Sequence, residues 1–181
     1  MNGEAMHFLY CVSCNRNNEK AVCHAIQKAI PGVIALTPLL ERTEKHNGVW
    51  ITSTIMLTPG YVFLFSNIAL DVRALQKTKH VTRVLSYVDE QTIDGISVKI
   101  QSYALVGADA DFALWIFKNE GIIRVSNGEI RDGVFCITDG PLANCYNKVK
   151  RVDKHNRKAL VCLPFDGNPL DLWLSFRWNT V

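Results

Sequence analysis

The 181-residue sequence lacks the motifs that mark several large classes of enzyme. It contains no GxxxxGK phosphate loop, no HExxH zinc motif and no GxSxG nucleophile elbow. Cys23 and His24 are neighbours on a predicted helix, so their side chains do not face each other as a thiol–histidine pair would. We therefore expect no catalysis, no cofactor and no metal ion. The remaining enzyme alternative is a thiol enzyme that uses Cys11, Cys14 or Cys23.

Long apolar runs and an export signal are also missing. The richest apolar stretch, residues 55–70, is broken by Pro59 and Gly60, whereas a membrane span needs about 20 apolar residues. The first residues, MNGEAMHF, lack the basic start, apolar run and cleavage site of a secretory signal. We expect a cytoplasmic protein without membrane contact.

The six cysteines are predicted to be buried thiols, because the expected compartment keeps thiols reduced. Cys11 and Cys14 form a CxxC inside the apolar run FLYCVSC, which has the period of a strand. An odd offset in a strand directs the two side chains to opposite faces. This placement disfavours a metal site or a redox pair.

Positive charge is concentrated in one stretch, KVKRVDKHNRK, from Lys148 to Lys158. The chain has 20 basic and 17 acidic residues and a net charge of +3. The stretch holds six cations and one acid, which is +5, so the rest of the chain sums to −2. A local basic cluster on a nearly neutral chain predicts a surface for a polyanion, most simply nucleic acid. The alternative is a solvated hairpin whose lysines keep an edge strand soluble.

The first two thirds of the chain alternate between strand and helix periods. We predict strands at residues 7–14, 33–41, 49–55, 60–65 and 82–87, and helices at 22–30, 68–75 and 109–119. Asn47-Gly48 makes the second and third strands a hairpin, whose charged tip we place at residues 41–46. Asn17 or Asn18 is expected to cap the first helix and Asn67 the second. This order predicts an α+β sandwich with an antiparallel sheet.

The pattern changes after residue 125. The polar and glycine residues of SNGEIRDG, 126–133, indicate a linker, and no helical period follows. Short strands are predicted at 134–138, 145–152, 157–163 and 171–176. A segment of about fifty residues made only of short strands indicates a small SH3-like barrel. We thus predict two domains, residues 1–125 and 134–181.

Two motifs in this order resemble the NusG family of transcription elongation factors. LTPGYVFLF, residues 57–65, resembles the FPGYV signature of the family's amino-terminal (NGN) domain, and Leu9-Tyr10 followed by Glu19 matches the spacing of its Trp-Tyr pair and glutamate. Residues 134–149, which include Gly140-Pro141-Leu142, resemble the KOW motif of its carboxy-terminal barrel. The resemblance spans nearly the whole chain and implies an NGN domain at 1–125 and a KOW domain at 134–181. Within the family, KVKRVDKHNRKA is most similar to the LoaP-type antiterminators, which recognise a nascent RNA hairpin.

The resemblance implies that the NGN domain docks on the clamp helices of the β′ subunit of RNA polymerase. Such docking needs an exposed apolar patch around the PGY strand. The alternatives are that Tyr61 and Phe63 are core and that the second helix presents only a solvated face. The residues expected at the polymerase are Leu9, Leu57, Pro59, Tyr61, Phe63, Arg73, Gln76 and Lys77.

The barrel is expected to hold RNA through the charges that flank the turn at Lys154-His155. Lysine and arginine neutralise the closely spaced phosphates of a hairpin, and His155 or Asn156 would supply base-edge or stacking contacts. The predicted RNA-binding residues are Lys148, Lys150, Arg151, Lys154, His155, Asn156, Arg157 and Lys158.

These inferences lead to one hypothesis and two rivals. The hypothesis is a monomeric elongation and antitermination factor that binds RNA polymerase with one domain and a leader RNA hairpin with the other. The first rival is a general NusG whose barrel binds ribosomal protein or termination factor. The second is a factor resembling RfaH, recruited by nontemplate DNA through Arg73, Gln76 and Lys77.

Overall fold

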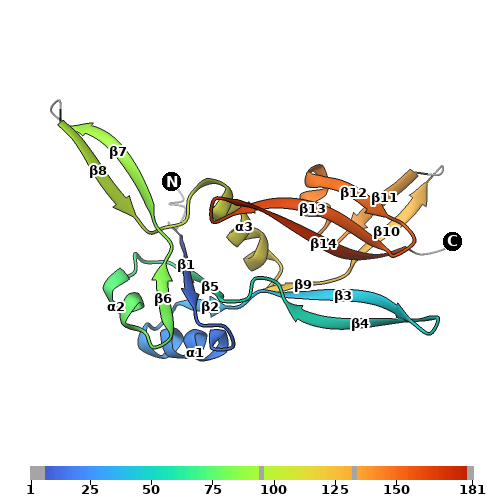
Figure 1. The fold of residues 1–181 in the computed structure, drawn as a ribbon, viewed down its shortest axis with the longest axis horizontal. Helices are drawn as coiled ribbons and strands as arrows, with labels where there is room; N and C mark the ends of the chain where they lie inside the picture. The colour runs from blue at the N-terminus through green and yellow to red at the C-terminus, as the bar shows by residue number, and fades with distance from the viewer. Residues whose placement is uncertain (1–6, 94–95, 132–133, 179–181) are drawn as a thin grey trace, which may run out of the picture. The chain divides into compact units, whose positions relative to one another are not determined.

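The computed structural model describes residues 7–93, 96–131 and 134–178 (Figure 1). The chain forms two compact units, and each unit is drawn from two stretches. The first unit comprises Met1–Thr37 and Thr58–Ala110, and the second comprises Pro38–Leu57 and Asp111–Val181. The predicted domains, 1–125 and 134–181, divide the chain at a different point.

A four-stranded antiparallel sheet lies at the centre of the first unit, in the order β2-β5-β1-β6. Helices α1 (Glu19–Ala29) and α2 (Val72–Lys77) share a hydrophobic core with this sheet. Val22 and Ile26, four residues apart on α1, are fully buried in a core that also holds Val12 and Leu64 of the sheet. The strands are β1 (Phe8–Cys14), β2 (Ile34–Leu36), β5 (Tyr61–Ser66) and β6 (Val81–Val84). An antiparallel sheet with helices is confirmed, but residues 39–41 and 49–55, which were predicted as part of it, belong to a separate sheet of the second unit.

Neither predicted asparagine cap forms. Asn18 occupies the N-cap position of α1, but its side-chain amide donates to the Arg16 carbonyl and makes no cap bond. Helix α2 begins after Asp71, whose Oδ1 accepts a hydrogen bond from Arg73 N at 2.9 Å. Asn67 lies outside this helix, with its Oδ1 2.8 Å from His7 Nδ1. The carboxylate of Asp71 is the better-placed acceptor for the free N–H groups of the first turn.

The first unit also contains a hairpin that the hydrophobic periodicity of the sequence did not predict. Strands β7 (Tyr87–Ile93) and β8 (Ile96–Ser102) pair antiparallel and extend from the sheet (Figure 1). The predicted strand at 82–87 is therefore two strands, since β6 ends at Val84. Tyr87 donates a hydrogen bond to Asp109 Oδ2 at 2.7 Å, which ties the base of the hairpin to α3 (Gly107–Lys118).

The second unit contains a five-stranded sheet in the order β11-β10-β14-β13-β12. Its interior holds Phe135 and Phe176, whose ring centres are 4.3 Å apart, and Trp115 of α3 donates to the Pro141 carbonyl at 3.1 Å. Residues 143–148, predicted in part as a strand, form the 3₁₀ helix η1 (Ala143–Lys148). The strands are β10 (Ser126–Arg131), β11 (Val134–Asp139), β12 (Val149–Asp153), β13 (Lys158–Phe165) and β14 (Asn168–Trp178).

Strand β10 occupies most of the segment predicted as a linker. It pairs antiparallel with β11 and parallel with β14. Gly128 was interpreted as a linker residue, yet it is buried in this strand, and a Cβ there would lie 2.7 Å from the Phe135 ring. The glycine therefore allows the ring to approach the backbone closely.

A second hairpin belongs to the second unit. Strands β3 (Leu39–His46) and β4 (Val49–Met56) are joined by Asn47 and Gly48, whose φ values of 49° and 84° suit a type I′ turn. The predicted turn is confirmed, but the charged residues 41–46 are part of β3 and not of the tip. Strand β3 also pairs with β9 (Ile122–Ile123), and Thr43 N donates to Ser175 Oγ of β14 at 3.0 Å.

No helix within the described ranges is long and apolar enough to cross a bilayer.

The buried carboxylate of Glu19 yields a prediction about stability. Its Oε1 accepts a hydrogen bond from Gly60 N at 2.8 Å, and Glu19 is only 2% exposed. Replacing Glu19 by alanine should lower the free energy of unfolding by about 2 kcal/mol, because it leaves a buried N–H without its acceptor. Glu19→Gln retains an oxygen acceptor, so its free energy of unfolding should fall much less. Equal chemical-denaturation curves for the two variants would contradict this role.

Candidate nucleic-acid interface

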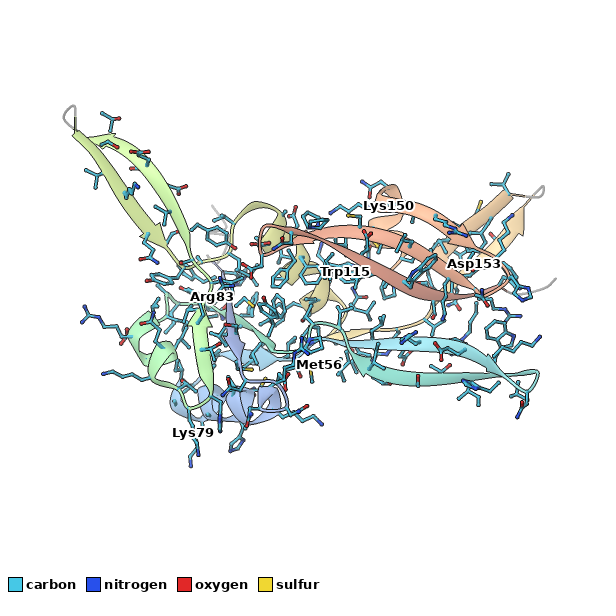
Figure 2. All side chains as sticks on the ribbon, viewed as in Figure 1. Met56, Lys79, Arg83, Trp115, Lys150 and Asp153 are labelled. Atoms are coloured by element: carbon cyan, nitrogen blue, oxygen red, sulfur yellow. The ribbon has the colours of Figure 1, made fainter. Side chains whose placement is uncertain are left out.

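The basic stretch forms a β-hairpin, because β12 and β13 flank a turn at residues 154–157. Asp153, labelled in Figure 2 together with Lys150, fixes this turn. Its Oδ1 accepts from Asn156 N at 2.9 Å and its Oδ2 from Asn156 Nδ2 at 2.8 Å. These hydrogen bonds hold the pKa of Asp153 below its usual value. The only acid of the cluster therefore shapes the turn that presents the cations.

Arg157, the last residue of the turn, packs against two tryptophans. Its guanidinium carbon lies 4.5 Å from the centre of the Trp50 ring of β4 and 5.6 Å from that of Trp178 of β14. Arginine over an aromatic face is an attractive cation–π arrangement. Arg157 was predicted to bind RNA, but here its side chain joins the β3–β4 hairpin to the five-stranded sheet.

Lys158 pairs with an acid far away in the sequence. Its Nζ lies 3.3 Å from Glu44 Oε1 of β3, and Arg42 Nη2 lies 2.9 Å from the same oxygen. The hydrogen bond from Lys158, followed by the positive charge of Arg42, lowers the pKa of Glu44. Two cations thus share one carboxylate at this end of the hairpin.

Lys150 pairs with Asp171 of β14, and the Nζ–Oδ1 distance is 3.0 Å. The hydrogen bond raises the pKa of Lys150 and lowers that of Asp171. Both side chains are about half exposed, so the ion pair contributes little to stability. It does cancel the charge that Lys150 was predicted to offer to RNA.

The remaining cations of the cluster face solvent. Lys148, Arg151 and Lys154 are exposed and make no ion pair with any other residue that the structure describes. His155 is exposed at the turn between them. All eight predicted RNA-binding residues lie on or beside one hairpin of the second unit, but four of them already have a partner in the protein.

Sequence reasoning missed the aromatic residues around this hairpin. Trp50 and Trp178 contact Arg157, and Trp173 of β14 is 37% exposed. A signal for Trp173 existed, because Leu172, Leu174 and Phe176 are spaced as the inward face of a strand. The residue between two inward positions points outward, and a large aromatic residue there is a candidate contact.

Some of the residues predicted to contact the polymerase are buried, and the others are partly or fully exposed. Leu9, Leu57 and Phe63 are buried, with Phe63 fully so on the central strand β5; these three side chains therefore form no exposed patch in this structure. Pro59 is exposed and Tyr61 half-buried. The α2 residues are all exposed, namely Arg73, Gln76 and Lys77. A role for any of them at the polymerase remains a prediction.

Three of the six cysteines are poorly suited to act as nucleophiles. None of the six forms a disulfide. Burial raises the pKa of Cys23 and of Cys145 to about 11 and also raises that of Cys14, so these thiols stay protonated near neutral pH. Within the described residues, no three His, Cys, Asp or Glu side chains are grouped to hold a metal ion.

The structure consists of an α+β unit and a β-rich unit that carries a basic hairpin, and this chain was compared with known proteins. No protein-family profile matches the sequence, and no curated protein matches it. Among solved structures, the chain is similar to one described as "Domain interaction in Thermotoga maritima NusG". The TM-score is 0.47 and the sequence identity 16%, with 94% of each chain covered.

Replacing Arg157 by glutamine should lower the free energy of unfolding by about 1 kcal/mol, since it removes the stacking on both tryptophans. The matched control is Arg151→Gln, which changes the same charge on the same hairpin and should leave stability almost unchanged. Urea denaturation of the two variants measures the difference. Equal stabilities would show that Arg157 does not hold the hairpins together.

The lowered pKa values of three carboxylates predict that the fold becomes less stable in acid. Glu44, Asp153 and Asp171 stabilise the fold fully above the ordinary carboxyl pKa of about 4, and this contribution disappears as the pH falls through their lower folded-state values. Thermal melts from about pH 6 to pH 2 should show falling stability at the acid end. The fall should be shallower for Glu44→Gln than for a control, Asp111→Asn, on the exposed face of α3. Parallel curves would contradict the prediction.

Proposed function

We propose that this chain is a NusG-type transcription elongation and antitermination factor whose second unit binds a hairpin in the nascent leader RNA. Two sets of sequence motifs in the right order support the family. The observation that carries the RNA-binding part is the group of three solvent-facing cations, Lys148, Arg151 and Lys154, beside a turn fixed by Asp153.

The electrostatics of the hairpin favour a phosphate ligand. Lys150 and Lys158 are paired with Asp171 and Glu44, so they add little net charge. The other cations lie within one hairpin, and folded RNA offers phosphates at close spacing, from which bound counterions are released. Because the turn is already hydrogen-bonded, binding orders little additional backbone.

The first unit is the proposed partner of RNA polymerase. Exposed Pro59 and half-buried Tyr61 lie in the segment that resembles the family signature, and the exposed face of α2 lies in the same unit. Two modest contacts, one to the enzyme and one to its transcript, reinforce each other through raised effective concentration. RNA binding would thus recruit a monomeric, non-catalytic, cytoplasmic factor to chosen operons.

A second candidate function rests on α2. Arg73, Gln76 and Lys77 are all exposed on this short helix, which favours a factor that reads the nontemplate DNA strand. In that case, replacing these three residues by alanine would abolish recruitment, whereas RNA-directed recruitment would survive.

The test uses the full chain and an RNA hairpin as the probe. Arg151→Gln and Lys154→Gln should each weaken binding and lower the salt slope, the steepness with which log K falls with log salt, by about one. The control is Lys118→Gln, which removes another exposed charge, from α3 of the same unit. Titrations at several salt concentrations measure both quantities.

A reporter assay tests the function itself. The double variant Arg151→Gln/Lys154→Gln should lose readthrough of a terminator placed behind the protein's own leader, and Lys118→Gln should not. Undiminished readthrough would refute RNA-directed recruitment. RNA binding that is absent or insensitive to salt would favour a barrel that binds a protein partner.

A further inference from the structure

A small hollow lies on the second unit beside the basic hairpin. It has a volume of about 220 Å³ and is lined by Arg42, Asp153, Asn156, Lys158 and Trp173. These residues come from β3, from β12 and its turn, and from β13 and β14. All of them belong to the second unit. A neighbouring hollow shares Asn156 and Lys158 as its wall.

Strand register places a cation and an aromatic residue on the same face of the sheet. Arg151 is opposite Leu160, and Leu160 is opposite Trp173. Directly opposed residues in a ladder point to the same side, so Arg151 and Trp173 flank Leu160 at two strand spacings, about 10 Å apart. A nucleotide bound across Leu160 would reach Arg151 with its phosphate and Trp173 with its base.

The hollow also offers unused hydrogen-bonding capacity. Asn156 donates one amide hydrogen to Asp153, and its Oδ1 accepts from no other described residue. Arg42 donates through Nη2 to Glu44, which leaves further N–H groups of its guanidinium. One acceptor and several donors beside an exposed indole ring suit the polar edge and flat face of a base.

We propose that this hollow holds one unpaired nucleobase of the bound RNA. The base stacks on Trp173, its edge meets Asn156 and Arg42, and the adjoining phosphate meets Arg151. This inference rests on the proposed RNA binding and deepens it, because it makes the site selective for RNA with an unpaired loop over continuous duplex.

The experiment compares two probes with the full chain. One probe is a blunt RNA duplex, and the other is the same duplex closed by a loop of adenosines that includes one 2-aminopurine. The wild-type chain should bind the looped probe more tightly. Trp173→Ala should lose roughly tenfold in affinity for the looped probe and almost nothing for the duplex. Trp173→Phe should keep most of the preference, since a flat ring remains.

Fluorescence gives a second readout, because stacking on the indole ring changes the emission of 2-aminopurine. Trp173→Ala should remove this change, and the control Leu114→Ala, an exposed apolar residue of α3, should not. Equal weakening of both probes by Trp173→Ala, or no weakening of either, would overturn the nucleobase site while RNA binding stands. A wild-type chain that binds neither probe would refute RNA binding itself, and the base site with it.

Discussion

The packing of Arg157 between Trp50 and Trp178 is the contact on which the candidate interface depends. Arg157 ends the turn of the basic hairpin with φ at 53°, a conformation that non-glycine residues rarely adopt. The same side chain contacts Trp50 and Trp178, which links β4 to the five-stranded sheet. Lys158–Glu44 and Thr43–Ser175 add to the same connection. Without these contacts Arg42 would no longer border the hollow, and the cationic turn would lose its support.

The cations in this region fall into two groups. Lys150, Arg157 and Lys158 contact other residues of the protein, whereas Lys148, Arg151 and Lys154 remain exposed to solvent. A count of basic residues therefore overstates the charge available to a ligand. The division also concentrates the uncompensated charge toward the turn and the start of β12, which gives a bound polyanion a preferred orientation.

Local patterns predicted the elements whose partners are near in sequence. The helical spacing of Val22 and Ile26 and the Asn47-Gly48 turn both led to the observed structure. The β7–β8 hairpin was missed because much of it is exposed on both faces and shows little burial period. At the site, the sequence predicted where the cations lie, but it did not predict which residues they contact. Glu44 and Lys158 are 114 residues apart, so no local signal shows that one neutralises the other.

The second unit takes its residues from two separate stretches, 38–57 and 111–181. During synthesis, the β3–β4 hairpin leaves the ribosome well before the strands that it packs against. At roughly 5–20 residues per second, this hairpin waits several seconds without its partners. Trp50 lacks its contact with Arg157 during that interval, so nascent chains are open to chaperones or to self-association. Completion of this unit therefore waits for the synthesis of β14.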